Sequence, residues 1–157
     1  MGIENDLAKF LLENNLTIST AESCTGGLLS SRLTDVSGSS NFVKLNVVTY
    51  ANEIKERVLG VTPKTLNTYG AVSEQCAREM VLGLKKLTNT DICVATTGIA
   101  GPTGGSDDKP VGLCYIGLLI KDKLTIKKIQ LSPTAPRTTI KNLFATCALE
   151  LIFKSLK

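Results

Sequence analysis

The chain has 157 residues, a formal net charge of +4 and no histidine. This length suits a single domain, residues 1–157, with a substantial core. Its basic residues are dispersed and it has no tryptophan, so we expect no nucleic-acid interface, which would need a clustered basic patch. The lack of histidine excludes a Ser-His-Asp triad, a Cys-His dyad and any His-based metal site.

The cysteines are odd in number, widely spaced and without a CxxC pair: Cys24, Cys76, Cys93, Cys114 and Cys147. Such a set is typical of reduced, mostly buried thiols in a reducing compartment, so we expect a cytoplasmic protein. Residues 1–15 predict an amphipathic helix rather than a signal peptide, because no basic leading segment precedes it. No apolar run approaches the length of a membrane span.

Hydrophobic periodicity predicts strands and helices in alternation along the chain. We expect helices at residues 3–14, 25–36, 52–59, 62 onward, 73–87 and 136–156, and strands at 17–21, 43–50 and 91–96. A hairpin of strands 111–120 and 124–131 should turn at 121–123. This order predicts an α/β fold, a three-layer α/β/α sandwich with a mixed, mainly parallel sheet.

Ser23 lies at the junction of a predicted strand and a predicted helix, within residues 20–27. Free backbone N–H groups and the positive end of a helix dipole would there stabilise the oxyanion that a serine nucleophile generates. The same position suits an ordinary helix N-cap, and the motif taken alone favours the cap.

Without histidine, the base for an activated Ser23 must be a lysine, a tyrosine, a carboxylate or water. Lys55 is expected in the first turn of a helix that Asn52 can cap, where the dipole disfavours its ammonium form and improves it as a base. Tyr50 ends the preceding strand. The residues alone leave open a second interpretation, in which Lys55 is solvated and pairs with Glu56 while Tyr50 belongs to the core.

A glycine-rich segment, residues 98–110, follows a predicted buried strand. Its glycines let backbone N–H groups approach an anion, but it lacks the Gly-Lys-Ser/Thr ending of a P-loop, which argues against an ATPase. As an isolated pattern it is a flexible connection. Because ligands of open α/β sheets bind beyond the carboxyl ends of strands, we expect Ser23, Tyr50 and Thr97 to converge there.

Five motifs, in order, resemble the CinA C-terminal domain family: residues 21–27, 38–40, 49–55, 70–73 and 98–112. That family includes stand-alone nicotinamide-nucleotide amidases, and its longer members carry an additional N-terminal domain. The resemblance implies hydrolysis of the carboxamide of nicotinamide mononucleotide to nicotinate mononucleotide and ammonia.

The resemblance also implies that Ser23 is the nucleophile and that Tyr50 and Lys55 assist it. Oxyanion and substrate binding fall to the other motif residues and one arginine: Cys24, Thr25, Gly26, Gly27, Asn52, Thr97, Gly98, Gly101, Gly104, Gly105 and Arg137. Cys24 is a rival nucleophile, but thiol chemistry on amides usually enlists a histidine. We expect no metal or other cofactor, and a pyridine nucleotide as the partner rather than nucleic acid or membrane. A homodimer is left open.

The chain departs from the family in two places. Asn46 stands where a glycine is common, and because asparagine tolerates positive φ we expect little damage. Residues 132–137 replace a Gly-Asp-Arg turn, and Lys141 replaces a second arginine, so a phosphate there would lose a bidentate contact. This altered stretch supports an alternative function, a non-catalytic nucleotide-binding or regulatory module.

Overall fold

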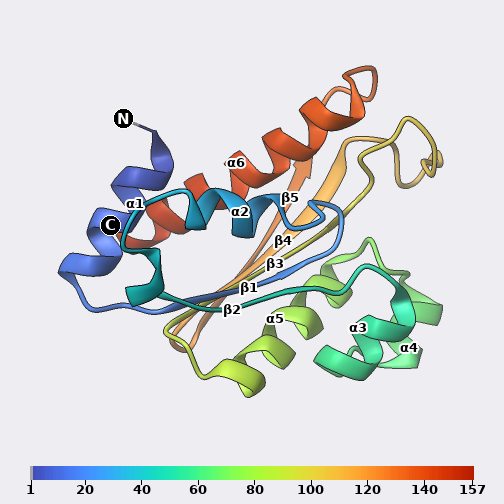
Figure 1. Cartoon of the computed structure of the whole chain (residues 1–157). Helices are drawn as coiled ribbons and strands as arrows, with labels where there is room; N and C mark the ends of the chain where they lie inside the picture. The colour runs from blue at the N-terminus through green and yellow to red at the C-terminus, as the bar shows by residue number, and fades with distance from the viewer. Residues whose placement is uncertain (1) are drawn as a thin grey trace.

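The computed structural model describes residues 2–157, whose strands form one sheet (Figure 1). Its order is β2 (Val43–Val48), β1 (Ile18–Glu22), β3 (Ile92–Gly98), β4 (Leu113–Ile120) and β5 (Lys123–Gln130). The β1–β2 and β1–β3 pairs are parallel, whereas β3–β4 and β4–β5 are antiparallel. Only β4 therefore runs against the other strands of the described chain, and the predicted mixed, mainly parallel sheet is confirmed.

Helices cover both faces of this sheet (Figure 1). On one face lie α1 (Ile3–Glu13), α2 (Leu28–Thr34) and α6 (Arg137–Leu156), whose apolar side chains share a core that includes Leu7, Leu29 and Phe144. On the other lie α3 (Asn52–Leu59), α4 (Pro63–Thr68) and α5 (Glu74–Thr88), over a core that includes Leu59 and Met80. A 3₁₀ turn, Ser39–Asn41, precedes β2. The three-layer α/β/α sandwich is confirmed.

Two predicted helix starts differ in outcome. Ser73 caps α5 as expected, because its hydroxyl accepts the N–H of Cys76 at 3.1 Å. Asn52 does not cap α3: the extended residue before the helix is Ala51, whose carbonyl accepts the N–H groups of Ile54 and Lys55. The chain thus turns into α3 one residue earlier than a cap at Asn52 requires.

Helix α3 rests closely on α5 at a glycine. A Cβ atom built on Gly83 would lie 1.8 Å from the carbonyl oxygen of Leu59, the last residue of α3. Only the absence of a side chain lets the two helices meet at this distance.

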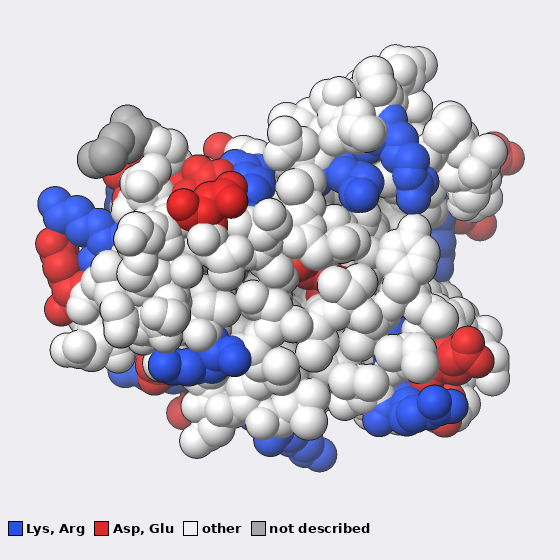
Figure 2. All heavy atoms as spheres, viewed as in Figure 1, with Lys and Arg blue, Asp and Glu red and all other residues white. Residues whose placement is uncertain are grey.

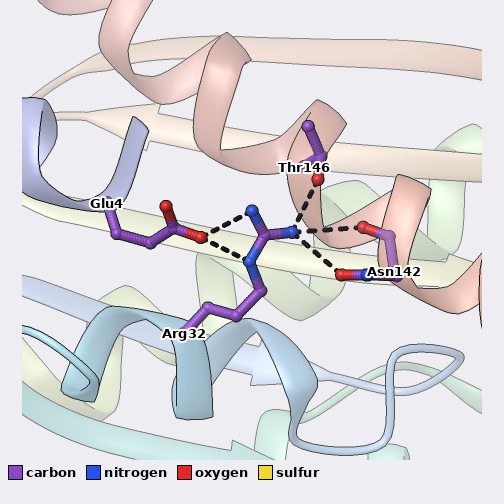
Figure 3. Close-up of polar contacts among 4 residues, drawn as sticks. All are labelled: Glu4, Arg32, Asn142 and Thr146. Carbon is purple, nitrogen blue, oxygen red and sulfur yellow. Dashed lines mark hydrogen bonds and ion pairs between the residues drawn. The ribbon is translucent and has the colours of Figure 1, made fainter. Parts of the chain in front are cut away.

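Arg32 connects α1, α2 and α6, the three helices on the face opposite α3 and α5 (Figure 3). From α2 its guanidinium binds Glu4 of α1, with Nε and Nη2 each 2.6 Å from Oε1. Its Nη1 donates to α6, to the hydroxyl of Thr146 at 2.6 Å and to both the carbonyl and side-chain oxygens of Asn142 at 3.2 Å. The Arg32 and Glu4 side chains are only 16% and 19% exposed, so solvent screens their contact little, and it connects α2 to α1.

Among residues 2–157, no helix is both long and apolar enough to cross a bilayer.

Replacing Arg32 by Met should lower the free energy of unfolding by about 1–3 kcal/mol at neutral pH, because Glu4, Asn142 and Thr146 lose a shared donor. Burial alone would raise the pKa of Glu4, but hydrogen bonds from its own backbone and from Arg32 bring it below 4.5. The stabilisation is therefore present above pH 4.5 and lost as pH falls through the lowered pKa.

Urea unfolding of both proteins from neutral to acidic pH measures this difference, which should shrink on acidification. Lys9→Met is the matched control, since its ion pair with Glu13 is exposed and 4.0 Å long and should contribute little. An Arg32→Met protein as stable as the control would contradict the assignment.

Candidate active site

A buried carboxylate, Glu22, organises the turn that carries Ser23. Its Oε1 accepts the N–H groups of Gly27 at 3.2 Å and Leu29 at 2.9 Å, and its Oε2 accepts that of Ser30 at 2.9 Å. These are the first N–H groups of α2, which lack partners within the helix. Glu22 thus does the work of an N-cap. The cap interpretation of Ser23 is wrong: Gly27, at φ 102°, precedes the helix, which begins at Leu28.

Hydroxyl groups extend this network on both sides of Glu22. Thr25 Oγ1 donates to Oε1 at 2.6 Å and lies 2.8 Å from Thr96 Oγ1. The Ser23 N–H in turn donates to the Thr96 carbonyl at 3.0 Å. The backbone of Ser23 is therefore tied to β3 and, through two threonines, to the carboxylate.

On the other side, Ser30 Oγ contacts both Glu22 and Thr20 Oγ1, and Thr20 Oγ1 lies 2.8 Å from Asn46 Oδ1. Asn46 sits within β2 and is not among the residues with positive φ. Asn46 therefore does not need the left-handed tolerance of asparagine, because its position is a regular strand position, and β2 forms as expected.

The contacts of the turn leave particular N–H groups free. Those of Ser23, Gly26 and Gly27 are engaged, by Thr96, by the Ser23 carbonyl at 3.0 Å and by Glu22. Within residues 2–157, no acceptor bonds the N–H of Cys24 or Thr25. Both N–H groups are therefore unengaged in the turn.

Lys55 is buried, with 1% of its surface exposed, and its Nζ donates to the backbone carbonyl of Tyr50 at 2.6 Å. Burial lowers the pKa of Lys55 from 10.5, while the nearby thiols of Cys76 and Cys24 act in the opposite direction. The predicted lowering is present, but its cause is loss of water rather than the helix dipole. Because Tyr50 is 58% exposed, the interpretation with a solvated lysine and a core tyrosine is wrong.

The Tyr50 hydroxyl lies away from Lys55, at the rim of a cavity. It accepts a hydrogen bond from Arg137 Nη2 at 3.2 Å, and Nη1 of the same guanidinium donates to the Gly101 carbonyl at 2.6 Å. Direct proton transfer between Tyr50 and Lys55 would need a contact between the tyrosine hydroxyl and the lysine amine. Instead, the amine contacts the backbone carbonyl of Tyr50.

The cavity beneath this rim has a volume of about 200 Å³. It gathers predicted site residues from four segments, together with Ile99, Ala100 and Thr103: Cys24, Tyr50, Gly98, Gly101, Gly104 and Arg137. Ser23 adjoins it through Cys24 and, like Lys55, is not part of the lining. Thr97, instead of entering the cavity, donates to the Ala71 carbonyl at 2.7 Å.

A second hollow, of about 560 Å³, is also lined in part by the turn that follows Ser23. Its lining joins predicted turn residues to α2 and α6: Thr25, Gly26, Gly27, Leu28, Ser31, Thr138, Lys141 and Asn142. Figure 2 shows basic side chains gathered near the start of α6, the helix that supplies Arg137 and Lys141. Gly105 lines a different, outer hollow with Pro102 and Asp107, and Asn52 is exposed on α3.

Sequence reasoning missed Glu22 and Thr96, which hold Ser23 in place. A signal existed for Glu22: an acidic residue directly before the turn and a hydroxyl residue, Thr25, three positions later. Nothing local identifies Thr96, because its contact with Thr25 spans 71 residues.

Lys55→Met should stabilise the protein at neutral pH, because it removes a cationic group from a buried position. With the folded pKa of Lys55 below 10.5, the unfolded chain binds more protons between the two values. The wild-type free energy of unfolding should therefore rise with pH through this window. That rise should be missing in Lys55→Met, as urea unfolding at a series of pH values can measure.

The exposed Lys44→Met serves as the control and should keep the wild-type pH dependence. Parallel pH curves for wild type and Lys55→Met would show that Lys55 is solvated.

Comparisons with known proteins identify the family and the fold. A family described as the CinA C-terminal domain matches residues 1–156. A CinA-like protein of Thermotoga neapolitana is 48% identical over 155 residues, covering 99% of this chain and 37% of that protein, so the chain spans just over a third of the length of such relatives.

Solved structures with lower sequence identity have the same fold. The competence/damage inducible protein CihA of Agrobacterium tumefaciens is 38% identical with a TM-score of 0.92, covering 100% of this chain and 98% of that one. The competence damage-inducible protein A of Klebsiella pneumoniae is 32% identical with a TM-score of 0.94, covering 98% and 94%. With a match along residues 1–156 and the same fold, this chain belongs to the CinA C-terminal domain family.

Proposed function

We propose that the chain hydrolyses the carboxamide of nicotinamide mononucleotide, giving nicotinate mononucleotide and ammonia. The observation that carries this proposal is a buried lysine of lowered pKa behind a serine turn that has two unengaged N–H groups. A serine, a lysine amine that loses its proton more readily than usual and two unengaged N–H groups are the parts that acyl transfer without histidine requires.

In the first step, the neutral amine of Lys55 takes the proton of Ser23 Oγ while that oxygen attacks the carboxamide carbon. The N–H groups of Cys24 and Thr25 hold the oxyanion. The C–N bond then breaks, and the amine leaves as ammonia with the proton returned from Lys55. Water, deprotonated by the same lysine, attacks the acyl group and releases the acid and Ser23.

Ser23 and Lys55 share no hydrogen bond within residues 2–157, because Lys55 Nζ donates to the Tyr50 carbonyl, and Ser23 is 8% exposed. Catalytic contacts of this kind often tighten only in the complex with substrate. Cys24 is a poorer nucleophile than Ser23, because its thiol packs in the core, 3.8 Å from the thiol of Cys114.

Tyr50 and Arg137 are assigned to substrate binding rather than to proton transfer. Their side chains bond each other in the lining of the cavity, and two Arg137 nitrogens are held there by the Tyr50 hydroxyl and the Gly101 carbonyl. Arginine presents five N–H donors, so others remain for a phosphate. The pyridine ring would enter the 200 Å³ cavity, leaving the charged end of the nucleotide at this rim.

Ser23→Ala should abolish ammonia release from nicotinamide mononucleotide while the protein stays folded. The loss of stability should be about 1 kcal/mol or less, because none of residues 2–157 hydrogen-bonds to Ser23 Oγ and α2 is capped by Glu22. Ammonia is measured in the presence of a chelator, with the exposed Ser37→Ala as the control. A folded Ser23→Ala protein with wild-type turnover would remove Ser23 from the mechanism.

The same assay separates the alternative function. Tight binding of the nucleotide by the wild type without ammonia release would identify a binding module instead.

Arg137→Ala should reduce kcat/KM for the mononucleotide by about 10- to 150-fold, the equivalent of one charge-assisted hydrogen bond of roughly 1.5–3 kcal/mol. Nicotinamide riboside, which has no phosphate, should be a poor substrate for the wild type and should lose little more in the variant. Arg57→Ala, an exposed arginine on α3, is the control. Equal use of both substrates by the wild type would show that no phosphate contact contributes.

A further inference from the structure

Two buried side-chain oxygens of residues 2–157 have no hydrogen-bond partner, Ser19 Oγ and Thr49 Oγ1. Thr49 is 1% exposed. An unpaired buried hydroxyl lowers the stability of the folded state, and such groups are rare in folded proteins. The position of Thr49 therefore needs a physical reason.

Thr49 lies beside Ser23. Glu22 is paired with Val48 in the parallel β1–β2 ladder, and the Thr49 N–H continues that ladder by donating to the Glu22 carbonyl at 2.8 Å. Ser23 and Thr49 are thus the next residues along two neighbouring strands.

Both side chains belong to the sheet face that α3 and α5 cover. Ala21 and Val47 pack in the core on that face, and side chains two residues apart along a strand point the same way. Ser23 and Thr49 follow them by two positions each. Lys55 approaches from α3 on this face, where the Cys76 thiol of α5 influences its charge.

The hydrogen-bonding capacity of Lys55 is incompletely used. A neutral amine has two N–H donors and one lone pair. One donor is taken by the Tyr50 carbonyl at 2.6 Å, and no second acceptor bonds Nζ within residues 2–157. Thr49 Oγ1 is an acceptor without a donor, on the residue that directly precedes that carbonyl.

We propose that Thr49 is a positioning residue for the amide hydrolysis put forward above, on which this inference rests. In the reacting state Thr49 Oγ1 accepts the second N–H of Lys55, after a rotation of either side chain. The Tyr50 carbonyl and the Thr49 hydroxyl then hold both N–H groups, and the remaining lone pair points toward the proton of Ser23. A single segment of backbone fixes the direction of the base.

Thr49→Val tests this role, because valine has nearly the same shape and lacks the hydroxyl. A purely structural hydroxyl without a partner predicts a variant that is at least as stable as the wild type and equally active. The proposal predicts the same stability with kcat reduced on the order of 10-fold, KM unchanged, and recovery in Thr49→Ser.

The pH profile supplies a second readout. The rate should rise with pH as Lys55 loses its proton, and a hydroxyl that accepts from the ammonium favours the charged form. Losing it should move the rising limb to lower pH in Thr49→Val. The other titratable groups facing Lys55 are Cys76 of α5 and Cys24 of the Ser23 turn, and both are unchanged in this variant.

Ser19→Ala is the matched control. It removes the other unpaired hydroxyl from the same sheet face, at a position on β1 about 13 Å from Ser23 by strand rise. It should match Thr49→Val in stability and keep wild-type kinetics.

Labelling by a fluorophosphonate separates this inference from the choice of substrate. Ser23 Oγ forms a bond to phosphorus, fluoride leaves, and Lys55 accepts the proton, so the rate reports the base without any nucleotide. Slower labelling in Thr49→Val than in Ser19→Ala would support the inference even if the mononucleotide were not hydrolysed. Equal kcat and labelling in wild type and Thr49→Val would overturn it alone. A wild-type Ser23 inert to both reagents would overturn the proposed function and this inference together.

Discussion

The buried carboxylate of Glu22 is the interaction on which the geometry of the site depends. It accepts N–H groups from the start of α2 and hydroxyl groups from Thr25 and Ser30. A buried carboxylate is tolerated only when it is surrounded by donors, and here the donors come from the turn and from the start of the helix. The turn between β1 and α2 therefore has one arrangement that satisfies them. In that arrangement the N–H groups of Cys24 and Thr25 have no hydrogen-bond acceptor within residues 2–157.

Local pattern was enough to predict the layers and several helix limits. The periodicity of residues 52–59 gave the bounds of α3, and Ser73 caps α5 through a contact only three residues away. The errors at Ser23 and Asn52 have a common cause, since both are good capping residues placed near helix starts whose N–H groups found other acceptors. Capping propensity describes what a side chain can do, whereas the backbone path decides whether it is needed.

Contacts between distant segments lay beyond any local pattern. The guanidinium of Arg137 donates a hydrogen bond to the Tyr50 hydroxyl, although the two residues are 87 positions apart in the sequence. The burial of Lys55 could not be predicted from local sequence either, because the residues of α3 are those of an exposed, charged helix. Packing against α5 buries one side of that helix. The motifs identified which residues belong to the site, and tertiary packing assigned each to its place: Lys55 inside, Tyr50 at the mouth, Glu22 beneath the turn.

The close meeting of α3 and α5 at Gly83 extends the reach of the site beyond its own residues. A Cβ atom at position 83 would clash with the carbonyl oxygen of Leu59. Leu59 lies one helical turn after Lys55. Any side chain at position 83 would displace the end of α3, and Lys55 lies on that same short helix. Gly83 therefore tolerates few substitutions, although it lines neither the 200 Å³ cavity nor the turn that carries Ser23. Substitutions at the exposed residues around the cavity should be tolerated better than substitutions at Gly83, where α3 and α5 are in contact.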